Sequence, residues 1–225
     1  MNPAARAQLD ELRQHLRSAA LATAGGFRPP QDPLTSWFGR GVGLPHETLP
    51  EFEGKPMFPL LQIRVAELPY VPEQLRDVAL LVLFHNQSRH PFDLPHGEGW
   101  LIREYARLDG LVPLPELTKP VKPFPIRWAR VDDDAPGWEG GWEIVDLAAV
   151  NDDEAATDAF FDGFTRYTGT KVGGYPYEIQ HGVGLHDFVF QVGSEEKVGW
   201  MWGDNGVGYF FRAPDGQWRW DCQFY

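Results

Sequence analysis

The sequence contains a single cysteine, Cys222, among its 225 residues. One thiol cannot form an intramolecular disulfide, and a zinc site made of several cysteines is excluded as well. The first residues alternate charged with apolar side chains instead of forming the apolar core of a signal peptide, and no stretch approaches the roughly 20 apolar residues that a membrane span requires. These absences predict a soluble, cytoplasmic protein that does not bind membranes.

Positive charge is also scarce, because 20 lysine and arginine residues stand against 32 acidic residues and give a formal net charge of -12. Such a field repels polyanions, which argues against nucleic acid as a ligand, and it attracts basic proteins. Two runs of carboxylates are candidate partner-binding residues, with a solvated turn or a metal site as the alternatives for the first run. They are Asp132, Asp133 and Asp134, and then Asp152, Asp153 and Glu154.

The common catalytic motifs are missing, since the sequence has no dinucleotide-binding glycine fingerprint, no phosphate-binding loop and no Gly-x-Ser-x-Gly. His85, His90 and His96 lie near Asp93, but their spacing matches no metal-ligand motif, and a polar loop after a strand explains them. Cys222 lies in an aromatic run where burial would raise its pKa. The sequence therefore indicates no catalytic residue, cofactor or metal ion, and it does not define an oligomeric state.

Two helices are expected. Asn2 followed by Pro3 is typical of a helix start, and leucines then recur at helical spacing, which predicts an appended helix from about Pro3 to Thr23. The acidic cap Asn151–Glu154 opens a second helix that we expect to end near Gly169.

The rest of the chain reads as short strands separated by glycine and proline. Apolar runs predict strands at Met57–Val65, Val78–Phe84, Trp100–Tyr105 and Phe124–Val131. Alternating residues predict further strands around Phe188–Val192, Trp200–Trp202, Tyr209–Phe211 and Trp218–Trp220. Prolines between residues 113 and 125 predict an extended connection. The expected fold is mainly β, a β-rich α+β protein with antiparallel strands.

A weak internal repeat divides this fold. Gly43-x-Pro45, Leu61-Gln-Ile63 and Leu81–Phe84 are followed, in the same order, by Gly174-x-Pro176, Phe190-Gln-Val192 and Gly208–Phe211. We therefore expect residues 1–31 to form the N-terminal helix and linker, and residues 32–225 to form one domain. Its two repeats would cover about 32–131 and 166–225, joined by the proline-rich segment and the second helix.

The repeat places Gln62 and Gln191 at equivalent positions between apolar strand residues. Each amide could satisfy backbone groups where the sheet ends, or the two could line a ligand cleft between the repeats. The candidate cleft residues are Gln62, Gln191, Lys55, Lys171, Trp200 and Trp202. Trp200, Trp202, Trp218 and Trp220 could instead be core residues or an exposed aromatic wall.

Four segments of the chain resemble the YwqG-like family, a bacterial domain of unknown function. They are Asp32–Gly39, Gly54–Ile63, Lys171–Pro176 and Met201–Asp204, with glycine, proline and aromatic residues as the shared features. The resemblance implies a duplicated, mostly β architecture. The resemblance also implies that genes of this family often lie beside polymorphic-toxin genes, and that some members are similar to cytoplasmic immunity proteins, which bind and block a toxin. The expected function is a non-catalytic immunity or antitoxin-type protein that neutralises a basic toxin acting on nucleic acid. The alternative is a small-ligand-binding or enzymatic module that uses the cleft between the repeats.

Overall fold

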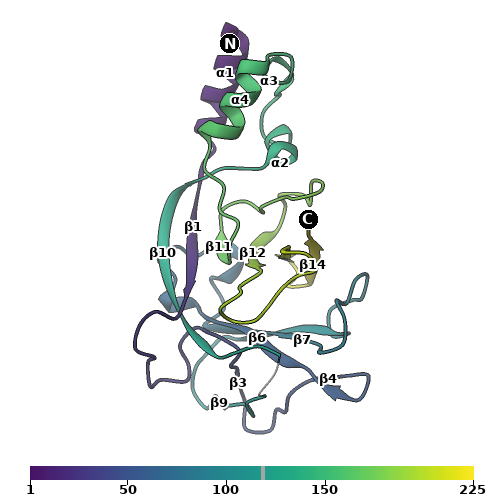
Figure 1. Cartoon of the computed structure of the whole chain (residues 1–225). Coiled ribbons are helices and arrows are strands. Elements are labelled where there is room, and N and C mark those ends of the chain that lie inside the picture. Colours follow the sequence, from purple (N-terminus) through teal and green to yellow (C-terminus); the bar gives the residue numbers. More distant parts are fainter. Residues whose placement is uncertain (118–119) are drawn as a thin grey trace.

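A ten-stranded antiparallel sheet forms the body of the protein in the computed structural model, which describes residues 1–117 and 120–225 (Figure 1). The strands run in the order β14-β13-β12-β11-β1-β10-β2-β6-β7-β8, so the predicted mainly β class is confirmed. Their bounds are β1 Arg17–Ala24, β2 Trp37–Phe38, β6 Phe58–Arg64, β7 Leu80–His85, β8 Trp100–Tyr105, β10 Phe124–Asp134, β11 Lys171–Gly173, β12 Phe188–Gly193, β13 Val207–Arg212 and β14 Trp218–Gln223.

Two two-stranded sheets and two short 3-10 helices accompany the main sheet in the described residues. Strand β3 (Val42–Gly43) pairs with β9 (Val112–Pro113), and β4 (Glu51–Phe52) pairs with β5 (Lys55–Pro56). Two short 3-10 helices, η1 (Val65–Glu67) and η2 (Glu73–Leu75), follow β6. The proline-rich segment expected to be an extended connection therefore contributes β9 and the start of β10, and its residues 118 and 119 lie outside the described residues.

The strand order is symmetric about the central pair β1 and β10. On one side lie β2, β6, β7 and β8, and on the other β11, β12, β13 and β14. The two central strands are exchanged between the sides. Strand β1, from the start of the chain, pairs with β11 of the C-terminal side, and β10 pairs with β2 of the N-terminal side. The strand order thus has the symmetry that a duplication predicts, while the repeat boundaries stay a prediction.

The register of the two sides places the glutamines at corresponding positions. Gln62 lies opposite Trp37 of β2, and Gln191 lies opposite Lys171 of β11. The Gly-x-Pro motifs do not occupy corresponding positions. In sequence, Gly43 lies further from Trp37, the partner of Gln62, than Gly174 lies from Lys171, the partner of Gln191. Gly39 and Gly173 correspond instead, each two residues after that partner and each with a positive φ, 71° and 77°. A side chain other than glycine would be strained there.

The N-terminal helix is shorter than predicted. Helix α1 spans Pro3–Arg13 and begins where expected, with the Asn2 side chain accepting the Ala5 N–H at 2.8 Å. The prediction is wrong for residues 17–23, which belong to β1, a strand that pairs with β10 on one side and β11 on the other. Alanine favours helices in isolation, but pairing on both edges overrides that propensity. The segment is therefore part of the sheet and not an appendage.

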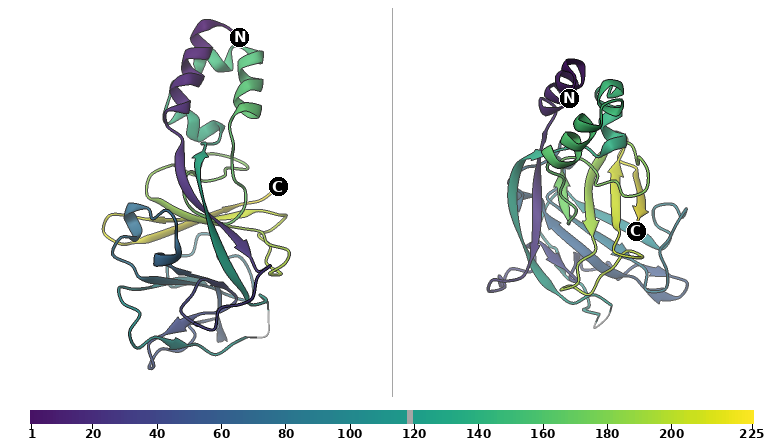
Figure 2. Two further views of the ribbon diagram at one scale, coloured as in Figure 1. Left: turned by 90° about the vertical axis from the view of Figure 1, so that its left-hand side faces the viewer. Right: turned by 45° about the horizontal axis from the view of Figure 1, so that its top comes forward.

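Helices gather at one end of the sheet, above β1 and β10 (Figures 1 and 2). We call residues 1–16 and 138–164 the helical cap; it contains α1, α2 (Trp138–Trp142), α3 (Ala148–Asn151) and α4 (Glu154–Gly163). Helix α4 begins at the predicted acidic cap but ends well before Gly169, and α2 and α3 were not expected. The cap has an apolar core of its own, which includes Leu9, Leu12, Val150 and Phe160.

The sheet is nearly closed because its edge strands β8 and β14 approach each other. Glu104 of β8 accepts the Trp218 indole N–H at 3.1 Å and an Arg212 Nη2 hydrogen at 3.1 Å. We call this line of side-chain contacts the seam. Residues Trp200–Trp202, predicted as a strand, form a loop with one isolated bridge from Trp200 to Glu195.

Candidate functional site

The negative charge of the protein is concentrated in one segment. Residues 131–165 contain eleven acidic residues and no lysine, arginine or histidine, whereas the rest of the chain has 20 basic against 21 acidic residues. The segment therefore carries -11 of the formal -12. It runs from the end of β10 through α2, α3 and α4. Nine of its acidic side chains are exposed: Asp132, Asp133, Glu139, Glu143, Asp146, Asp152, Glu154, Asp158 and Asp162.

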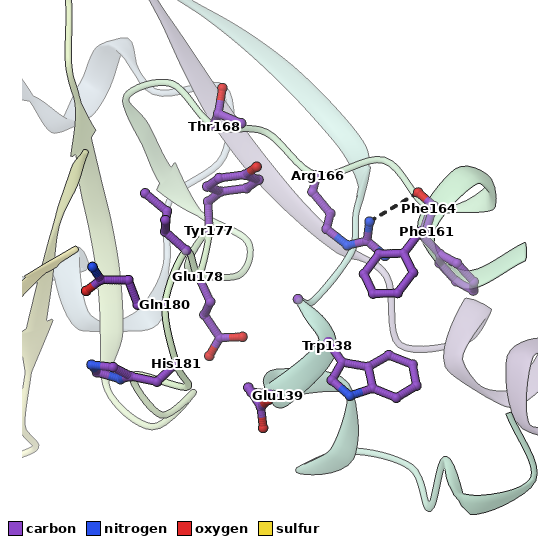
Figure 3. Close-up of a pocket in the computed structure, with 12 residues that line it drawn as sticks. Trp138, Glu139, Phe161, Phe164, Arg166, Thr168, Tyr177, Glu178, Gln180 and His181 are labelled. Carbon is purple, nitrogen blue, oxygen red and sulfur yellow. Dashed lines mark hydrogen bonds between the residues drawn. The ribbon is translucent and has the colours of Figure 1, made fainter. Parts of the chain in front are cut away.

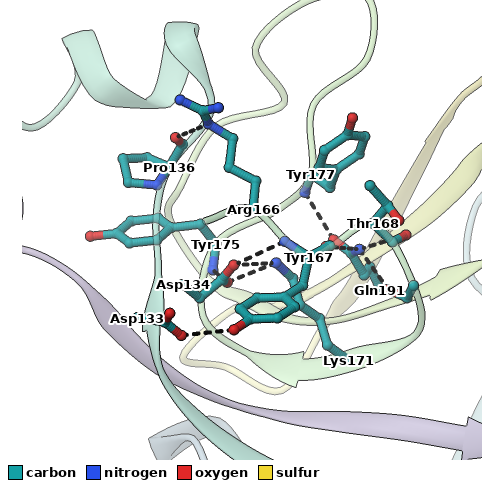
Figure 4. A network of polar contacts seen from close by, with 11 residues as sticks. Asp133, Asp134, Pro136, Arg166, Tyr167, Thr168, Lys171, Tyr175, Tyr177 and Gln191 are labelled. Carbon is teal, nitrogen blue, oxygen red and sulfur yellow. Dashed lines mark hydrogen bonds and ion pairs between the residues drawn. The ribbon is translucent and has the colours of Figure 1, made fainter. Parts of the chain in front are cut away.

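Asp134, predicted to contact a partner, is fully buried, which contradicts that prediction. Its carboxylate accepts from Lys171 Nζ at 2.9 and 2.7 Å and from the Tyr175 N–H at 2.8 Å (Figure 4). Burial raises the pKa of Asp134 and lowers that of Lys171, while their mutual attraction opposes both shifts. This ion pair joins the end of β10 to β11, just below the helical cap.

The other two residues of this run are exposed but have partners. Asp132 pairs with Arg130 at 2.7 Å and accepts from Ser18 Oγ at 2.6 Å, and these hydrogen bonds hold its pKa below the usual value. Asp133 accepts from the Tyr167 hydroxyl at 2.8 Å. The first run is therefore engaged with its own chain.

The second run divides into one structural and two free carboxylates. Asp153 is the N-cap of α4, accepting the Ala156 N–H at 3.1 Å, and it also accepts the Asn2 N–H at 2.6 Å. Asp152 and Glu154 point to solvent.

An acidic stripe continues along α4, since Glu154, Asp158 and Asp162 are spaced four residues apart. Like charges at this spacing destabilise a helix, and a carboxylate in the last turn, such as Asp162, opposes the helix dipole. Among the residues that the structure describes, no ion pair involves any of seven cap carboxylates: Glu139, Glu143, Asp146, Asp152, Glu154, Asp158 and Asp162. The missing basic residues are a signal that sequence reasoning overlooked.

A pocket of about 480 Å³ lies beside this surface, between the helical cap and the loop of residues 177–181 (Figure 3). Trp138 of α2 and Phe161 of α4 are stacked, with ring centroids 5.7 Å apart. Figure 3 shows Tyr177 and Glu178 across the pocket from them. Phe161 is 53% exposed, which is unusual for a ring of this size.

Two carboxylates and one guanidinium line the pocket, and they belong to Glu139, Glu178 and Arg166. Glu178 accepts the N–H groups of Gly140 and Val183, both at 3.1 Å, and its pKa is raised by burial and by nearby carboxylates. Arg166 donates to the carbonyls of Pro136 at 3.1 Å and Phe160 at 2.8 Å. It therefore binds the last turn of α4 rather than Glu178.

The structure does not gather the six predicted cleft residues into one site, although Lys171 lies opposite Gln191 and Trp200 contacts Trp202. Gln62 and Gln191 are fully buried and donate to backbone carbonyls, Gln62 to that of Thr35 at 2.6 Å and Gln191 to that of Gly169 at 2.8 Å. This is the structural alternative stated above. Lys55 is exposed on the β4–β5 hairpin, whereas Lys171 is buried against Asp134.

Of the four tryptophans for which core packing and an exposed aromatic wall were the alternatives, Trp200 and Trp202 are core residues. Trp200 and Trp202 are 8% and 0% exposed and contact His85 and His90 in a cluster of rings. Burial lowers the pKa of His85 to about 4. One nitrogen of each of these four side chains has no hydrogen-bond partner in the described residues.

A groove of about 710 Å³ follows the seam, where the two sides of the sheet meet. Trp100, Trp218 and Trp220 line it together with His96 and Asp93, and none of the six predicted cleft residues does. Nearby, burial raises the pKa of the Cys222 thiol to about 12, so the thiol stays protonated. In the described part of the chain, no group of three or more His, Cys, Asp or Glu side chains could hold a metal ion.

The fold and these sites define a β-rich protein with a charge-balanced sheet and an acidic helical cap. A family model described as "Domain of unknown function (DUF1963)" matches residues 39–216, and the chain belongs to this family. No curated protein matches the chain. Within residues 1–117 and 120–225, no helix has the length and apolar character needed to cross a membrane.

Proposed function

We propose that this protein is a cytoplasmic, non-catalytic binding protein of the immunity or antitoxin type, related to the YwqG-like proteins that it resembles. Its acidic helical cap covers a basic toxin, one that acts on nucleic acid. The observation that carries this proposal is the segregation of charge: residues 131–165 hold -11 of the formal -12 and expose nine carboxylates.

The seven exposed carboxylates between residues 139 and 162 have no ion-pair partner among the described residues, so a basic surface would find them available. Two exposed aromatic residues of the cap, Trp142 and Phe161, supply apolar contact area of the kind that dominates protein interfaces. Carboxylates arranged in this way steer a cationic partner toward the cap.

The test measures how fast the partner binds. After pull-down from the native host and identification by mass spectrometry, the purified partner is titrated against the triple variant Asp152→Lys, Glu154→Lys and Asp158→Lys. We expect its association rate to fall at least about tenfold, and to fall again as salt shortens the Debye length to about 8 Å.

A matched control reverses three exposed carboxylates outside the cap that have no ion pair in the described structure: Glu51→Lys, Glu98→Lys and Asp109→Lys. This control changes the net charge equally and should slow association much less. Equal losses in both triple variants would leave only a general charge effect and would reject the cap as the binding surface.

The seam favours a second candidate function, binding of a small ligand. Its groove is lined by three indoles, and four buried ring nitrogens without hydrogen-bond partners in the described residues lie in the adjoining cluster. A buried unpaired polar group costs about 1–3 kcal/mol, so a ligand that reached these nitrogens would gain by pairing them. A ligand of the seam should change tryptophan fluorescence in the wild type and lose affinity in Trp220→Ala, whereas Trp142→Ala on the cap should leave binding unchanged.

A further inference from the structure

The pocket beside the acidic surface combines aromatic walls with carboxylates. Trp138 and Phe161 form one wall, and Tyr177 lies across from them (Figure 3). The faces of aromatic rings carry negative potential and attract cations within about 6 Å. A planar cation such as a guanidinium can also stack on these aromatic rings.

Carboxylates crowd one end of this pocket. Glu139 and Glu178 both line it, and the pKa of Glu178 is raised by burial first and then by the nearby carboxylates of Glu143 and Glu139. Both are packed against glycines: a Cβ on Gly137 would lie 2.6 Å from Glu178 Oε2, and one on Gly182 would lie 3.1 Å from Glu139 Cβ. A side chain at either glycine would therefore crowd these glutamates.

Neither carboxylate forms an ion pair among the described residues, although each carboxylate offers about four lone-pair sites. Glu178 uses two of them for the N–H groups of Gly140 and Val183. The remaining acceptors face a pocket that the acidic segment surrounds with negative potential.

Arg166 also lines the pocket but does not neutralise these groups. Its three nitrogens donate to the carbonyls of Pro136, Phe160 and Phe161 at 2.8 to 3.3 Å. Two of these carbonyls belong to the last turn of α4, where the helix dipole amounts to about half a negative charge. These contacts hold the guanidinium of Arg166 at the end of α4, where it also lies over the Phe160 and Phe161 rings, at 4.5 and 5.6 Å from their centroids.

We infer that this pocket binds the guanidinium group of an arginine side chain contributed by the basic protein partner, an inference that rests on the proposed function. A guanidinium has five N–H donors in one plane, so it can stack on an aromatic ring while donating to Glu178 and Glu139. The ammonium of lysine donates as a point charge and gains less from flat walls.

The probe for this inference is N-acetyl-L-arginine amide, which carries the cation without a carboxylate. Binding is followed by NMR through the Gly140 N–H, which donates to Glu178, and the indole N–H of Trp138. We expect saturable shifts of both signals, with affinity at least about tenfold above that of the neutral N-acetyl-L-norleucine amide, because charge-assisted hydrogen bonds are the stronger ones.

Two variants and one control locate the site. Glu178→Gln keeps the shape of the side chain and should weaken the arginine probe about tenfold, and Phe161→Leu, at an exposed ring, should weaken it without threatening the fold. Glu154→Gln removes a cap carboxylate outside the pocket and should leave binding of the probe nearly unchanged.

The outcomes separate this inference from the function on which it rests. Equal binding of the arginine and norleucine probes, or full binding by both Glu178→Gln and Phe161→Leu, would overturn the pocket assignment. Preferential binding of acetate near Arg166 would overturn it too, and would identify an anion site. None of these results changes the salt dependence and charge-reversal test of the acidic cap, which the proposed function must pass with the partner itself.

Discussion

The sheet and the helical cap differ in whether their carboxylates form ion pairs. In the sheet and its loops, carboxylates are matched by arginines, as in the pairs Arg64–Asp32, Arg89–Glu53 and Arg212–Glu104. In the cap, seven exposed carboxylates have no such partner within the described residues. The acidic stripe along α4 does not stabilise that helix, and this difference from the sheet is what supports the proposal that the cap binds an external cation.

The buried Asp134–Lys171 pair joins β10 to β11 at the end of the sheet below the helical cap, and removing one partner should have the largest effect. Lys171→Met leaves the carboxylate of Asp134 buried and unpaired, and we expect a loss of about 3–5 kcal/mol in the free energy of unfolding, measured by urea denaturation. Adding Asp134→Asn removes the orphaned charge while keeping an acceptor, and should recover part of the loss. If the double variant is less stable than Lys171→Met, the pair does not act through charge.

The free energy of unfolding should depend on pH through a histidine in the interior of the sheet, His85. His85 has a pKa of about 4 in the fold and about 6.5 when unfolded, so the unfolded chain binds more protons between these values. The contribution of neutral His85 is complete above pH 6.5 and is lost as the pH falls toward 4, an expected change of about 3 kcal/mol.

His85→Phe should flatten the stability profile in this window, as followed by denaturation at a series of pH values. A profile that is equally steep in His85→Phe would assign the pH dependence to other groups.

The smallest expected change in stability comes from replacing one carboxylate by lysine, and we expect it to have opposite signs in the helical cap and in the sheet. Asp162→Lys places a cation at the last turn of α4, where the dipole favours it, and should stabilise the protein by about 0.5 kcal/mol while weakening partner capture. Glu104→Lys makes the same change in the sheet, where it removes the acceptor of the Trp218 indole and one acceptor of Arg212, and should destabilise the protein. Thermal denaturation compares the two; a destabilising Asp162→Lys would show that the cap carboxylates support the fold.

Much of the fold was visible in the sequence because its strands are apolar and alternate. Trp100–Tyr105 was predicted with the observed bounds, and β6, β7, β12, β13 and β14 were predicted within a few residues. Strand β1 was missed because its alanines favour a helix locally, and only the distant strands β10 and β11 hold it extended.

The candidate site was less predictable, because it depends on contacts between distant residues. Nothing local distinguishes buried Asp134 from exposed Asp133; the difference is Lys171, 37 residues away. The pocket likewise joins α2 and α4 to the loop at Tyr177. The acidic segment needed no structure, since the absence of basic residues between Arg130 and Arg166 is a property of the sequence.

The exchange of β1 and β10 has a consequence for synthesis of the chain on the ribosome. Ala22 of β1 pairs with Trp128 of β10, a residue made more than a hundred positions later. At about 5–20 residues per second, β1 waits on the order of 5 to 20 s for its first neighbour. Its other neighbour, β11, follows later still. During that interval both edges of β1 are unpaired, and a row of free backbone N–H and C=O groups is a template for pairing with another chain. The nascent protein is therefore most vulnerable to aggregation before its second half emerges, and neither half can complete its own sheet without the other.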